Sequence, residues 1–464
     1  MPSYEPVIGL EIHVQLATRT KMFCGCELSF GEEPNTRCCP VCLGLPGALP
    51  VTNAEAIHFG LLIGMALGSE IAPKSIFHRK NYFYPDNPKA YQVSQYDEPL
   101  NSGGRLGDVR IHRVHLEEDA AKLVHAGASG RIHGSEASVV DFNRCGTPLV
   151  EIVTEPDVRS AEQAREWLTL LRETLRQLGV SDVNMEEGSL RCDANVSIRP
   201  EGTEAFGTKT ELKNMNSFRF IERGINAEIA RQTEILTSGG QVEQETLHFD
   251  PRTERITSLR SKEEAHDYRY FPEPDLVPVA ITEEMLVRAR KAMPELPAAR
   301  AERLAGLGLS DDQARLLAFR RELADQFEEA LAAGGASPAG LANWIGNEEK
   351  ALEVEPASLA ALVAMVEARE ITRDAGQTVL AKLAEGGGDP KAIVEAEGLG
   401  AMGGGDELAP IVAAALEANP DVAEKLRGGD MKPVGVIVGH VMRETRGRAD
   451  GGEVTRLVRE QLGL

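Results

Sequence analysis

The sequence predicts an α+β protein in which a strand-rich front part precedes a helical back part. Up to about Pro294, short β-like runs alternate with glycine turns and a few helices, whereas Ala, Leu, Glu and Arg dominate the residues that follow. The chain has 464 residues, and since a domain usually takes roughly 100 to 200 residues, we expect about two to four domains. Its 42% hydrophobic and 26% charged residues are close to globular averages, which excludes a disordered or fibrous chain.

Two amphipathic helices are expected in the front part. From residue 160 to 178 apolar residues recur at helical spacing, Ser160 and Gln163 form a capping box, and Gly179 provides a stop. A second run, residues 217–236, has the same periodicity and ends before two glycines. Apolar stripes of this kind normally pack against a core, so we interpret both helices as scaffold.

Several predicted strands have aliphatic side chains on one face and carboxylates or other charged side chains on the opposite face. In residues 7–16, strict alternation places four aliphatic side chains on one face and Glu11 and His13 on the other. Two further runs alternate in the same way, with the polar positions Arg191, Asp193, Asn195, Ser197 and Arg199 (residues 189–199) and Lys209, Glu211 and Lys213 (208–214). Glu117, Glu118 and Asp119 close another β-like run, and Glu151 is embedded in the run 149–153.

These carboxylates have two interpretations. A carboxylate inside an aliphatic strand is costly to bury alone, so five such strands suggest a shared divalent cation or a cationic ligand. Oxygen ligands with one imidazole suit magnesium or manganese. For any single strand the alternative is a carboxylate that faces solvent on one side of an antiparallel sheet. Spacing alone does not show whether the five strands converge, and both interpretations stay open at this point.

Five of the seven cysteines crowd between Cys24 and Cys42. The pairs Cys24-Gly-Cys26 and Cys39-Pro-Val-Cys42 have the spacing of a tetrahedral thiolate zinc site, and Cys38 is a fifth thiol that this geometry does not need. Four thiolates close the coordination shell, so such a zinc would be structural. The alternative is a group of cysteines without a metal. A local cluster of this kind is typical of a reducing compartment and not of a secreted disulfide framework.

The net charge of −22 repels nucleic acid as a whole, so any RNA contact needs a local basic patch. The first residues lack both the basic segment and the apolar segment of a signal peptide, and no stretch approaches ~18 uncharged apolar residues. We therefore expect a cytoplasmic protein.

Basic side chains near the carboxylates are of the kind that phosphate chemistry needs. They are Lys80, Lys89, Lys209, Lys213 and Arg269, with Arg79 beside the first. Tyrosines and a phenylalanine interleave with Lys80 and Lys89, which fits a nucleotide or RNA surface and equally fits a packed loop. Residues 202–210 come closest to a phosphate-binding P-loop but lack its Gly-Lys-Ser/Thr step. Cys145 has no recognised base near it in sequence, which argues against a glutaminase-like nucleophile.

The last segment carries a local excess of positive charge. Between Met431 and Arg459 six basic and three acidic side chains give +3 within a chain of −22. The candidate RNA-binding residues are Lys432, Arg443, Arg446 and Arg448. The alternative is an ordinary solvated helix end. Glycine triplets at 386–388 and 403–405 predict flexible segments that divide the back part.

Six motifs resemble the B-subunit family of the aspartyl/glutamyl-tRNA(Asn/Gln) amidotransferases, the GatB family. They are residues 7–16 (VIGLEIHVQL), 79–91 (RKNYFYPDNPKAY), 116–119 (LEED), 185–195 (MEEGSLRCDAN), 209–214 (KTELKN) and 267–275 (DYRYFPEPD). The resemblance covers the whole chain, in order and in length.

This resemblance implies a fold and an activity. The front domain (residues 1–294) would be a cradle like the glutamine synthetase fold, followed by a helical domain (295–400) and a small helical tail that contacts tRNA (401–464). The family forms a heterotrimer with an amidase, the A subunit, which releases ammonia from glutamine, and with a small C subunit. The B subunit uses ATP and magnesium to phosphorylate the side-chain carboxylate of Glu on tRNA(Gln) or Asp on tRNA(Asn), and ammonia then displaces phosphate.

The resemblance also implies site residues. The metal-binding positions of the family fall on Glu11, His13, Glu117, Glu118, Glu151, Asp193 and Glu211. Of these, we expect catalytic roles for Glu11, His13, Glu118, Glu151 and Asp193. The zinc site occurs in part of the family and is kept here at Cys24, Cys26, Cys39 and Cys42. The alternative function is a non-catalytic, zinc-bearing tRNA-binding scaffold, for which the acidic strand faces are exposed to solvent and ATP is irrelevant.

Overall fold

The computed structural model describes residues 3–28, 30–126, 137–261, 268–402, 404–445 and 447–464. The chain divides into two compact units, Met1–Leu296 and Pro297–Leu464. Within the described ranges all strands belong to the first unit and the second unit is helical. The mixed α+β class with a helical back part is therefore confirmed.

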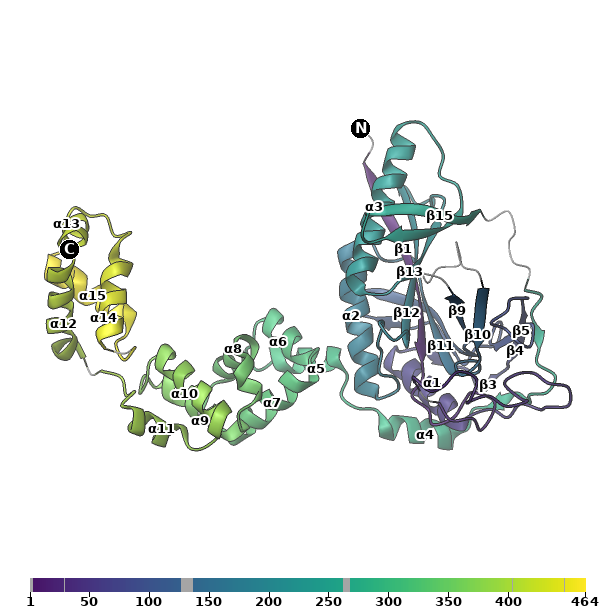
Figure 1. Cartoon of the computed structure of the whole chain (residues 1–464), viewed down its shortest axis with the longest axis horizontal. Coiled ribbons are helices and arrows are strands. Elements are labelled where there is room, and N and C mark those ends of the chain that lie inside the picture. Colours follow the sequence, from purple (N-terminus) through teal and green to yellow (C-terminus); the bar gives the residue numbers. More distant parts are fainter. Residues whose placement is uncertain (1–2, 29, 127–136, 262–267, 403, 446) are drawn as a thin grey trace. The chain divides into compact units, whose positions relative to one another are not determined.

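One large sheet organises the first unit (Figure 1). Its strands follow in the order β15 (Arg255–Ser261), β14 (Glu245–Asp250), β13 (Thr210–Met215), β12 (Leu190–Pro200), β1 (Tyr4–Gln15), β11 (Pro148–Thr154), β8 (Val109–Glu118), β6 (Asn101–Ser102) and β2 (Glu70–Ile71), and β7 (Arg105–Leu106) pairs with β8. The central pairs from β13 to β8 are all antiparallel. The five runs with polar positions thus become five adjacent strands, which spacing alone could not establish.

Helices cover one face of this sheet. Helices α2 (Ala161–Leu178) and α3 (Phe218–Thr237) lie along it (Figure 1), and α1 (Ala54–Ala66) packs against β8. The aliphatic residues of β1 that face this core are at most 1% exposed: Ile8, Leu10, Ile12 and Val14. Because side chains alternate along a strand, Glu11 and His13 are left on the opposite face of the sheet.

The two predicted scaffold helices are confirmed, with one difference in capping. The Ser160 hydroxyl accepts a hydrogen bond from the Gln163 amide nitrogen at 3.1 Å, and Gly179 ends α2 in the left-handed region at φ 69°. The Gln163 side chain, however, accepts from the backbone nitrogen of Arg159 at 2.8 Å and not from that of Ser160. Only one half of the predicted capping box therefore forms.

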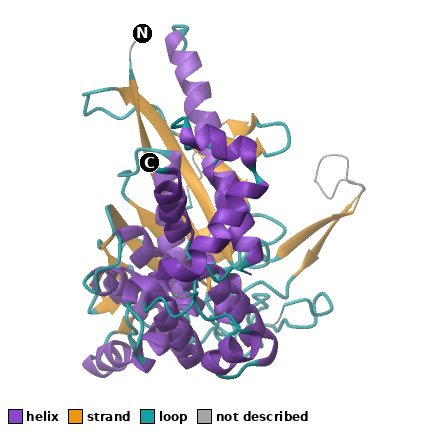
Figure 2. Cartoon of the chain, turned by 90° about the vertical axis from the view of Figure 1, so that its left-hand side faces the viewer, coloured by secondary structure: helices purple, strands orange, loops and turns teal. Residues whose placement is uncertain are grey.

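Within the described residues, three small sheets complete the first unit, together with α4 (Glu283–Ala292). They are β4 (His78–Asn81) with β5 (Tyr91–Ser94) and β16 (Phe271–Pro272), β9 (Lys122–Ala126) with β10 (Ala137–Asp141), and β3 (Lys74–Ser75) with β17 (Val279–Ala280). Figure 2 shows the β9–β10 ribbon extending away from the large sheet. Strand β5 packs beside β8, which brings the predicted basic segment next to the acidic strands.

In the part of the second unit that the structure describes, buried apolar residues form two hydrophobic clusters, one within residues 304–399 and one within 408–458. Its helices are α5 (Pro297–Ala305), α6 (Asp311–Ala318), α7 (Arg321–Ala333), α8 (Pro338–Asn347), η1 (Glu349–Leu352), α9 (Pro356–Glu367), α10 (Arg373–Gly386), α11 (Pro390–Glu397), α12 (Gly404–Ala418), α13 (Pro420–Arg427), α14 (Val434–Glu444) and α15 (Gly451–Leu462). None of the helices in the described residues is long and apolar enough to span a bilayer.

The predicted flexible segments have different outcomes. Gly387 and Gly388 adopt positive φ values of 64° and 111° between α10 and α11, as expected for a break between helices. The segment 403–405 is in part helical, since α12 begins at Gly404, while Gly403 lies outside the described residues. The predicted break therefore serves partly as a helix start.

Candidate active site and metal centre

The sheet register brings the predicted residues together. On β1, Glu11 is the cross-strand partner of Asp193 on β12, and His13 is the partner of Glu151 on β11. Glu151 is in turn paired with His115 on β8. Cross-strand partners place their side chains on the same face about 5 Å apart. The convergence that the sequence left open is therefore present on one face of the sheet.

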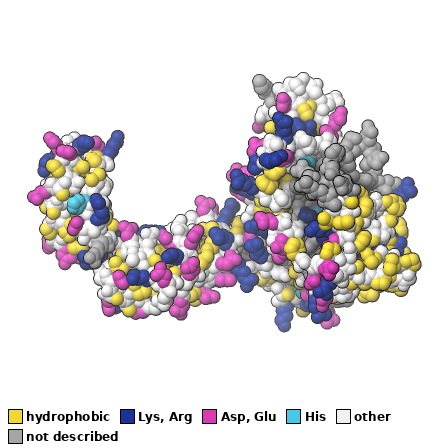
Figure 3. All heavy atoms as spheres, in the orientation of Figure 1, with side chains coloured by type: hydrophobic (Ala, Val, Ile, Leu, Met, Phe, Trp, Pro, Cys, Tyr) yellow, Lys and Arg dark blue, Asp and Glu magenta, His cyan; other side chains and the backbone are white. Residues whose placement is uncertain are grey.

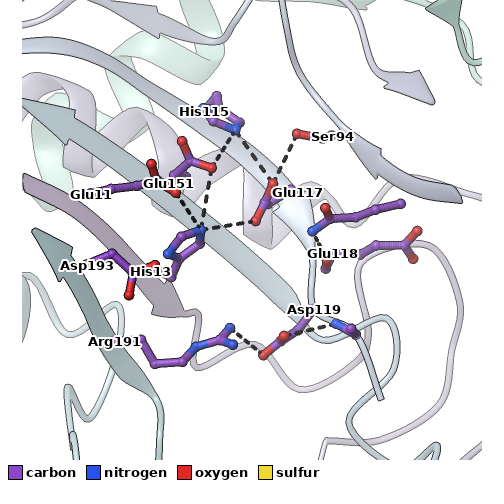
Figure 4. Close-up of polar contacts among 12 residues, drawn as sticks. Glu11, His13, Ser94, His115, Glu117, Glu118, Asp119, Glu151, Arg191 and Asp193 are labelled. Carbon is purple, nitrogen blue, oxygen red and sulfur yellow. Dashed lines mark hydrogen bonds and ion pairs between the residues drawn. The ribbon is translucent and has the colours of Figure 1, made fainter. Parts of the chain in front are cut away.

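Three carboxylates surround the imidazole of His13 (Figure 4). Its Nε2 atom lies 3.4 Å from Glu151, 3.7 Å from Glu11 and 3.8 Å from Glu117. Glu117 and Glu151 are 2% and 4% exposed. For these residues, the interpretation of solvent-facing carboxylates is wrong, because they are buried beside one another.

A second imidazole shares two of these carboxylates. The Nε2 atom of His115 lies 3.5 Å from Glu151 and 3.7 Å from Glu117. Two triads, Glu11–His13–Glu151 and His115–Glu117–Glu151, each bring their ligand atoms within 4.8 Å of one another. Carboxylate oxygens with imidazole nitrogens form a donor set suited to magnesium or manganese. Because both triads use Glu151, they could hold two cations that share a ligand.

The electrostatics of the cluster fit a cation site. Burial lowers the pKa of His13, but the hydrogen bond and charge of Glu151, with the charges of Glu117 and Glu11, raise it to about 9. Burial and the neighbouring Glu151 charge raise the pKa of Glu11. Burial also raises the pKa of Glu151, yet the two histidines hold it well below its ordinary value. The protonated imidazole is thus a positive charge at the point where the carboxylates converge.

Asp193 and Glu211 lie one and two strands further along the sheet. Lys213 joins them, donating to Asp193 at 2.6 Å and lying 2.9 Å from Glu211. Burial opposes its charge, but the two carboxylates raise the pKa of Lys213 above its ordinary value. A register shift between Cys192 and Ala194 interrupts the β12–β13 ladder at Asp193. These side chains therefore form an ionic group beside the His13 cluster.

Glu118 does not join the His13 cluster. Consecutive residues of a strand point to opposite faces, so Glu118 turns away from Glu117. Its carboxylate accepts hydrogen bonds from Lys89 and from the backbone nitrogen of Val93, the latter at 2.9 Å. With Lys89 it lines a cavity of about 210 Å³ that Cys42 also borders. Glu118 therefore does not lie among the other carboxylates, and its position does not support the expected ligand and catalytic roles.

Of the other predicted phosphate-binding residues, Lys80 lies nearest the cluster. Burial lowers its pKa, but the charges of Glu117, Tyr270 and Glu151 raise it above the ordinary value. Lys209 is exposed just before β13. Arg269 is exposed as well, at φ 46°, and its carbonyl accepts from the Asn81 side chain at 2.9 Å. The structure thus brings Lys80 and Lys213 to the acidic face and leaves Lys209 and Arg269 exposed.

The sequence reasoning missed His115 and the pair Arg191–Asp119. His115 precedes Glu117 by two positions, so strand alternation was a signal that both share a face. Arg191 on β12 donates at 2.9 Å to the buried Asp119, which directly follows β8 and is far away in sequence, so no local pattern indicates this pair. Figure 4 shows Arg191 and Asp119 beside the His13 cluster.

The four cysteines of the predicted zinc site form one cluster. The sulfur atoms of Cys24, Cys26, Cys39 and Cys42 all lie within 4.8 Å of one another. Four sulfurs at Zn–S distances of ~2.3 Å would lie about 3.8 Å apart, close to this spacing. Hydrogen bonding by Cys24, opposed by burial, lowers the pKa of Cys42 to about 4. The Cys38 thiol instead donates to the Asn35 carbonyl at 3.3 Å, so the fifth cysteine lies outside the cluster as expected.

The predicted RNA-binding residues lie on and around α14. Arg443 is exposed on the last turn of this helix, and Lys432 is exposed before its start. Arg448 donates from Nε to the Thr445 carbonyl at 3.0 Å. Arg446 lies outside the described residues. Arg456, a further basic residue of the +3 window, is paired with Glu453 at 2.7 Å and Glu460 at 2.9 Å and contributes little free positive charge.

The chain is similar to known proteins over nearly its whole length. A family model described as the GatB/GatE catalytic domain matches residues 6–287, and one described as the GatB domain matches residues 325–462. The chain is 50% identical over 488 residues to the B subunit of the aspartyl/glutamyl-tRNA(Asn/Gln) amidotransferase of Frankia casuarinae, covering 99% of this chain and 96% of that protein. The B subunit of the Thermus thermophilus enzyme is 47% identical over 477 residues, covering 99% and 100%. That of Persephonella marina is 47% identical over 479 residues, covering 99% of each.

Fold and site define an α+β protein whose sheet presents a cluster of histidines and carboxylates suited to divalent cations, followed by a helical unit. The matches over nearly the full length identify the family of the chain. The chain belongs to the B-subunit family of the aspartyl/glutamyl-tRNA(Asn/Gln) amidotransferases.

Proposed function

We propose that this protein activates the side-chain carboxylate of Glu on tRNA(Gln), of Asp on tRNA(Asn), or of both, by phosphorylation from ATP. Ammonia delivered by the glutaminase, the A subunit, then displaces phosphate and leaves Gln-tRNA(Gln) or Asn-tRNA(Asn). This makes the chain part of a ligase that forms carbon–nitrogen bonds with glutamine as the amide donor. The observation that carries the proposal is the pair of histidine–carboxylate triads on one sheet face, supported by family membership.

The residues of the sheet face have separate roles in this proposal. Glu11, His13, Glu151 and Glu117, with His115, would hold magnesium, which would offset negative charge during phosphoryl transfer. Lys80, close to Glu117 and Glu151, and Lys213, paired with Asp193 and Glu211, would bind the phosphates. No general base is needed for the attack, because the aminoacyl carboxylate is already ionised at neutral pH.

We also propose that the front domain, residues 1–294, is a cradle of the glutamine synthetase type. ATP would then lie on the acidic sheet face, consistent with the lack of a P-loop motif. Residues 295–400 and 401–464 would be a helical domain and a tRNA-contacting tail. Their separate hydrophobic clusters support this division.

We propose that a partner protein supplies the ammonia. Cys145 is 3% exposed, its thiol donates to the Cys42 carbonyl at 3.3 Å, and burial with the nearby Glu118 charge raises the pKa of this thiol to about 12. A thiol of this kind is a poor nucleophile.

Several large apolar side chains are exposed on the first unit, among them Phe83 and Val277, and Figure 3 shows hydrophobic side chains gathered on one side of it. Such a surface fits the A and C subunits of a heterotrimer.

The four-cysteine cluster is proposed to bind one structural zinc. Four thiolate ligands leave no open position for catalysis. All seven cysteines are free, which suits the reducing cytoplasm, where we propose that the protein acts.

Formation of ADP by the assembled complex tests the proposed function. ADP should form in an amount that depends on Glu-tRNA(Gln) or Asp-tRNA(Asn), and it should stay near background with the uncharged tRNA. If the amidated product forms without ATP consumption, or if the same amount of ADP forms with uncharged and with aminoacylated tRNA, the chain is a scaffold and does not activate the carboxylate.

A further inference from the structure

Lys21 lies in the segment between β1 and the first cysteine pair. Its backbone nitrogen donates to the Cys26 carbonyl at 3.0 Å, and the next residue, Met22, donates to the Gly146 carbonyl at 2.8 Å. The Asn53 side chain donates to the Lys21 carbonyl at 3.2 Å. The backbone here is thus held between the cysteine cluster and the turn that precedes β11.

The side chain of Lys21 is buried and points at the cysteine cluster. The residue is 0% exposed, and it is among the largest fully buried side chains of the described chain. Its ammonium donates to the Cys42 sulfur at 3.7 Å and to the Phe142 carbonyl at 3.3 Å. A buried ammonium is costly unless a negative partner compensates it. Of these two acceptors, the sulfur is the one that becomes negatively charged as a thiolate.

A zinc ion with four thiolates has a net charge of −2, and Cys42, one of its four proposed ligands, is buried. An N–H···S hydrogen bond from a cation lowers the electron density on that sulfur and compensates part of the charge. Groups that hydrogen-bond to metal ligands commonly change metal affinity by roughly 10- to 100-fold. Lys21 has the position, burial and charge for this role.

We propose that Lys21 stabilises the zinc-bound form of the four-cysteine site by donating to the Cys42 thiolate, and that it protects this sulfur from electrophiles. This proposal rests on zinc binding by the four cysteines. Both residues border the cavity of about 210 Å³ that also contains Lys89 and Glu118. The lysine and the proposed zinc ligand therefore both border a polar space through which a small reagent could approach.

The test compares the full-length chain with Lys21→Met, Lys21→Gln and Lys21→Arg. Lys74→Met is the matched control, since Lys74 is an exposed lysine paired with Glu98 at 3.1 Å. The readouts are zinc content after purification, zinc loss to the chromogenic chelator 4-(2-pyridylazo)resorcinol, and the rate at which N-ethylmaleimide modifies Cys42, mapped by mass spectrometry. Circular dichroism reports whether each variant is folded.

Lys21→Met should lose zinc roughly 10- to 100-fold more readily and expose Cys42 to faster modification, whereas Lys21→Arg and Lys74→Met should stay much closer to the parent chain. Should Lys21→Met fail to fold, Lys21→Gln, which keeps a polar donor without the charge, carries the same comparison. A parent chain purified without zinc contradicts the zinc site itself. A zinc-loaded parent whose neutral Lys21 variants retain metal and resist modification equally well overturns the role of Lys21.

Discussion

The Nε2 atom of His13 lies 3.4 Å from the carboxylate of Glu151, its cross-strand partner in the β1–β11 pair. Glu151 also faces His115 from the neighbouring strand at 3.5 Å, so one buried carboxylate connects two imidazoles. In a sheet, such a meeting requires three strands in a fixed register. The site is therefore a property of the β1–β11–β8 pairing and not of a loop.

Glu11→Gln and His13→Ala should abolish activation while tRNA binding persists. Glu11→Gln replaces a charged carboxylate of the proposed cation site by a neutral amide, and His13→Ala removes its imidazole, and neither changes a residue of the second unit. Since loss of a group that merely supports a ligand costs 10- to 100-fold, loss of a ligand should lower kcat at least ~100-fold. The measurement is ADP formation with saturating aminoacyl-tRNA. His112→Ala is the control, because His112 is paired with Glu155 at 2.9 Å outside both triads and should behave as the parent chain. Near-normal turnover by Glu11→Gln would remove this residue from the mechanism.

Binding of a divalent cation should release a proton from His13. The pKa of this histidine is raised from its ordinary value to about 9 by Glu151, Glu117 and Glu11 against the effect of burial, so at neutral pH a cation must displace the proton. The apparent affinity should rise about tenfold per pH unit toward pH 9 and level off above it. Calorimetry in two buffers of different ionisation enthalpy measures the released proton. Loss of this pH dependence in His13→Gln would confirm that the proton comes from His13. A cation affinity that does not change with pH in the parent chain would contradict the predicted proton release.

Arg191→Met should destabilise the first unit. Asp119 is 4% exposed and accepts from Arg191 at 2.9 Å and from Gln15 at 2.7 Å, while Arg144 lies 3.8 Å away. Breaking a buried pair costs several kcal/mol, but Gln15 and Arg144 remain and Arg191 is partly exposed, so we expect about 2 to 3 kcal/mol at neutral pH.

This loss should shrink in acid. Burial raises the pKa of Asp119, but the charges of Arg191 and Arg144 depress it overall. A carboxyl with a depressed folded pKa contributes stability above its unfolded value of about 4 and loses it as the pH falls through the folded pKa. Urea unfolding of Arg191→Met and of the parent chain, at neutral pH and in acid, measures whether the loss of stability becomes smaller in acid. Arg110→Met, which breaks the more exposed pair with Asp157, should cost much less than Arg191→Met. Equal losses for the two variants at neutral pH would contradict a special role for the Arg191–Asp119 pair.

Local faces and caps could be predicted from the sequence, whereas pairings across the chain could not. Alternation assigned Glu11 and His13 to one face because strand geometry has a period of two. The meeting of His13 with Glu151 depends on β1 pairing with a strand more than a hundred residues away, which no local window contains. The family resemblance placed Glu118 with Glu117 among the metal-binding positions, although alternation along β8 turns the two side chains to opposite faces. Alternation placed Arg191 on a polar strand face, but its pairing with Asp119 and the contact of Lys21 with Cys42 could not be predicted, because only the fold brings these partners together.

Arg443→Gln should weaken tRNA binding. If Arg443 contacts a tRNA phosphate, its loss should reduce the slope of log affinity against log salt by about 0.7 to 0.9, and kcat should change little. Arg456→Gln is the matched control on the same tail, because Arg456 is already paired with Glu453 and Glu460. Filter binding over a range of salt concentrations measures both slopes. An unchanged slope for Arg443→Gln would show that this residue is only part of a solvated helix end.

Transfer of oxygen from the aminoacyl carboxylate to phosphate tests the central claim most directly. In the proposed reaction, a carboxylate oxygen first attacks the γ-phosphorus of ATP and ADP leaves. Ammonia then attacks the carbonyl carbon, and phosphate departs with the former carboxylate oxygen. Glu-tRNA(Gln) or Asp-tRNA(Asn) labelled with ¹⁸O in the side chain should therefore yield inorganic phosphate that carries one ¹⁸O atom per amidated product, detected by mass spectrometry. Amidated product accompanied by unlabelled phosphate would contradict activation of the carboxylate by phosphorylation.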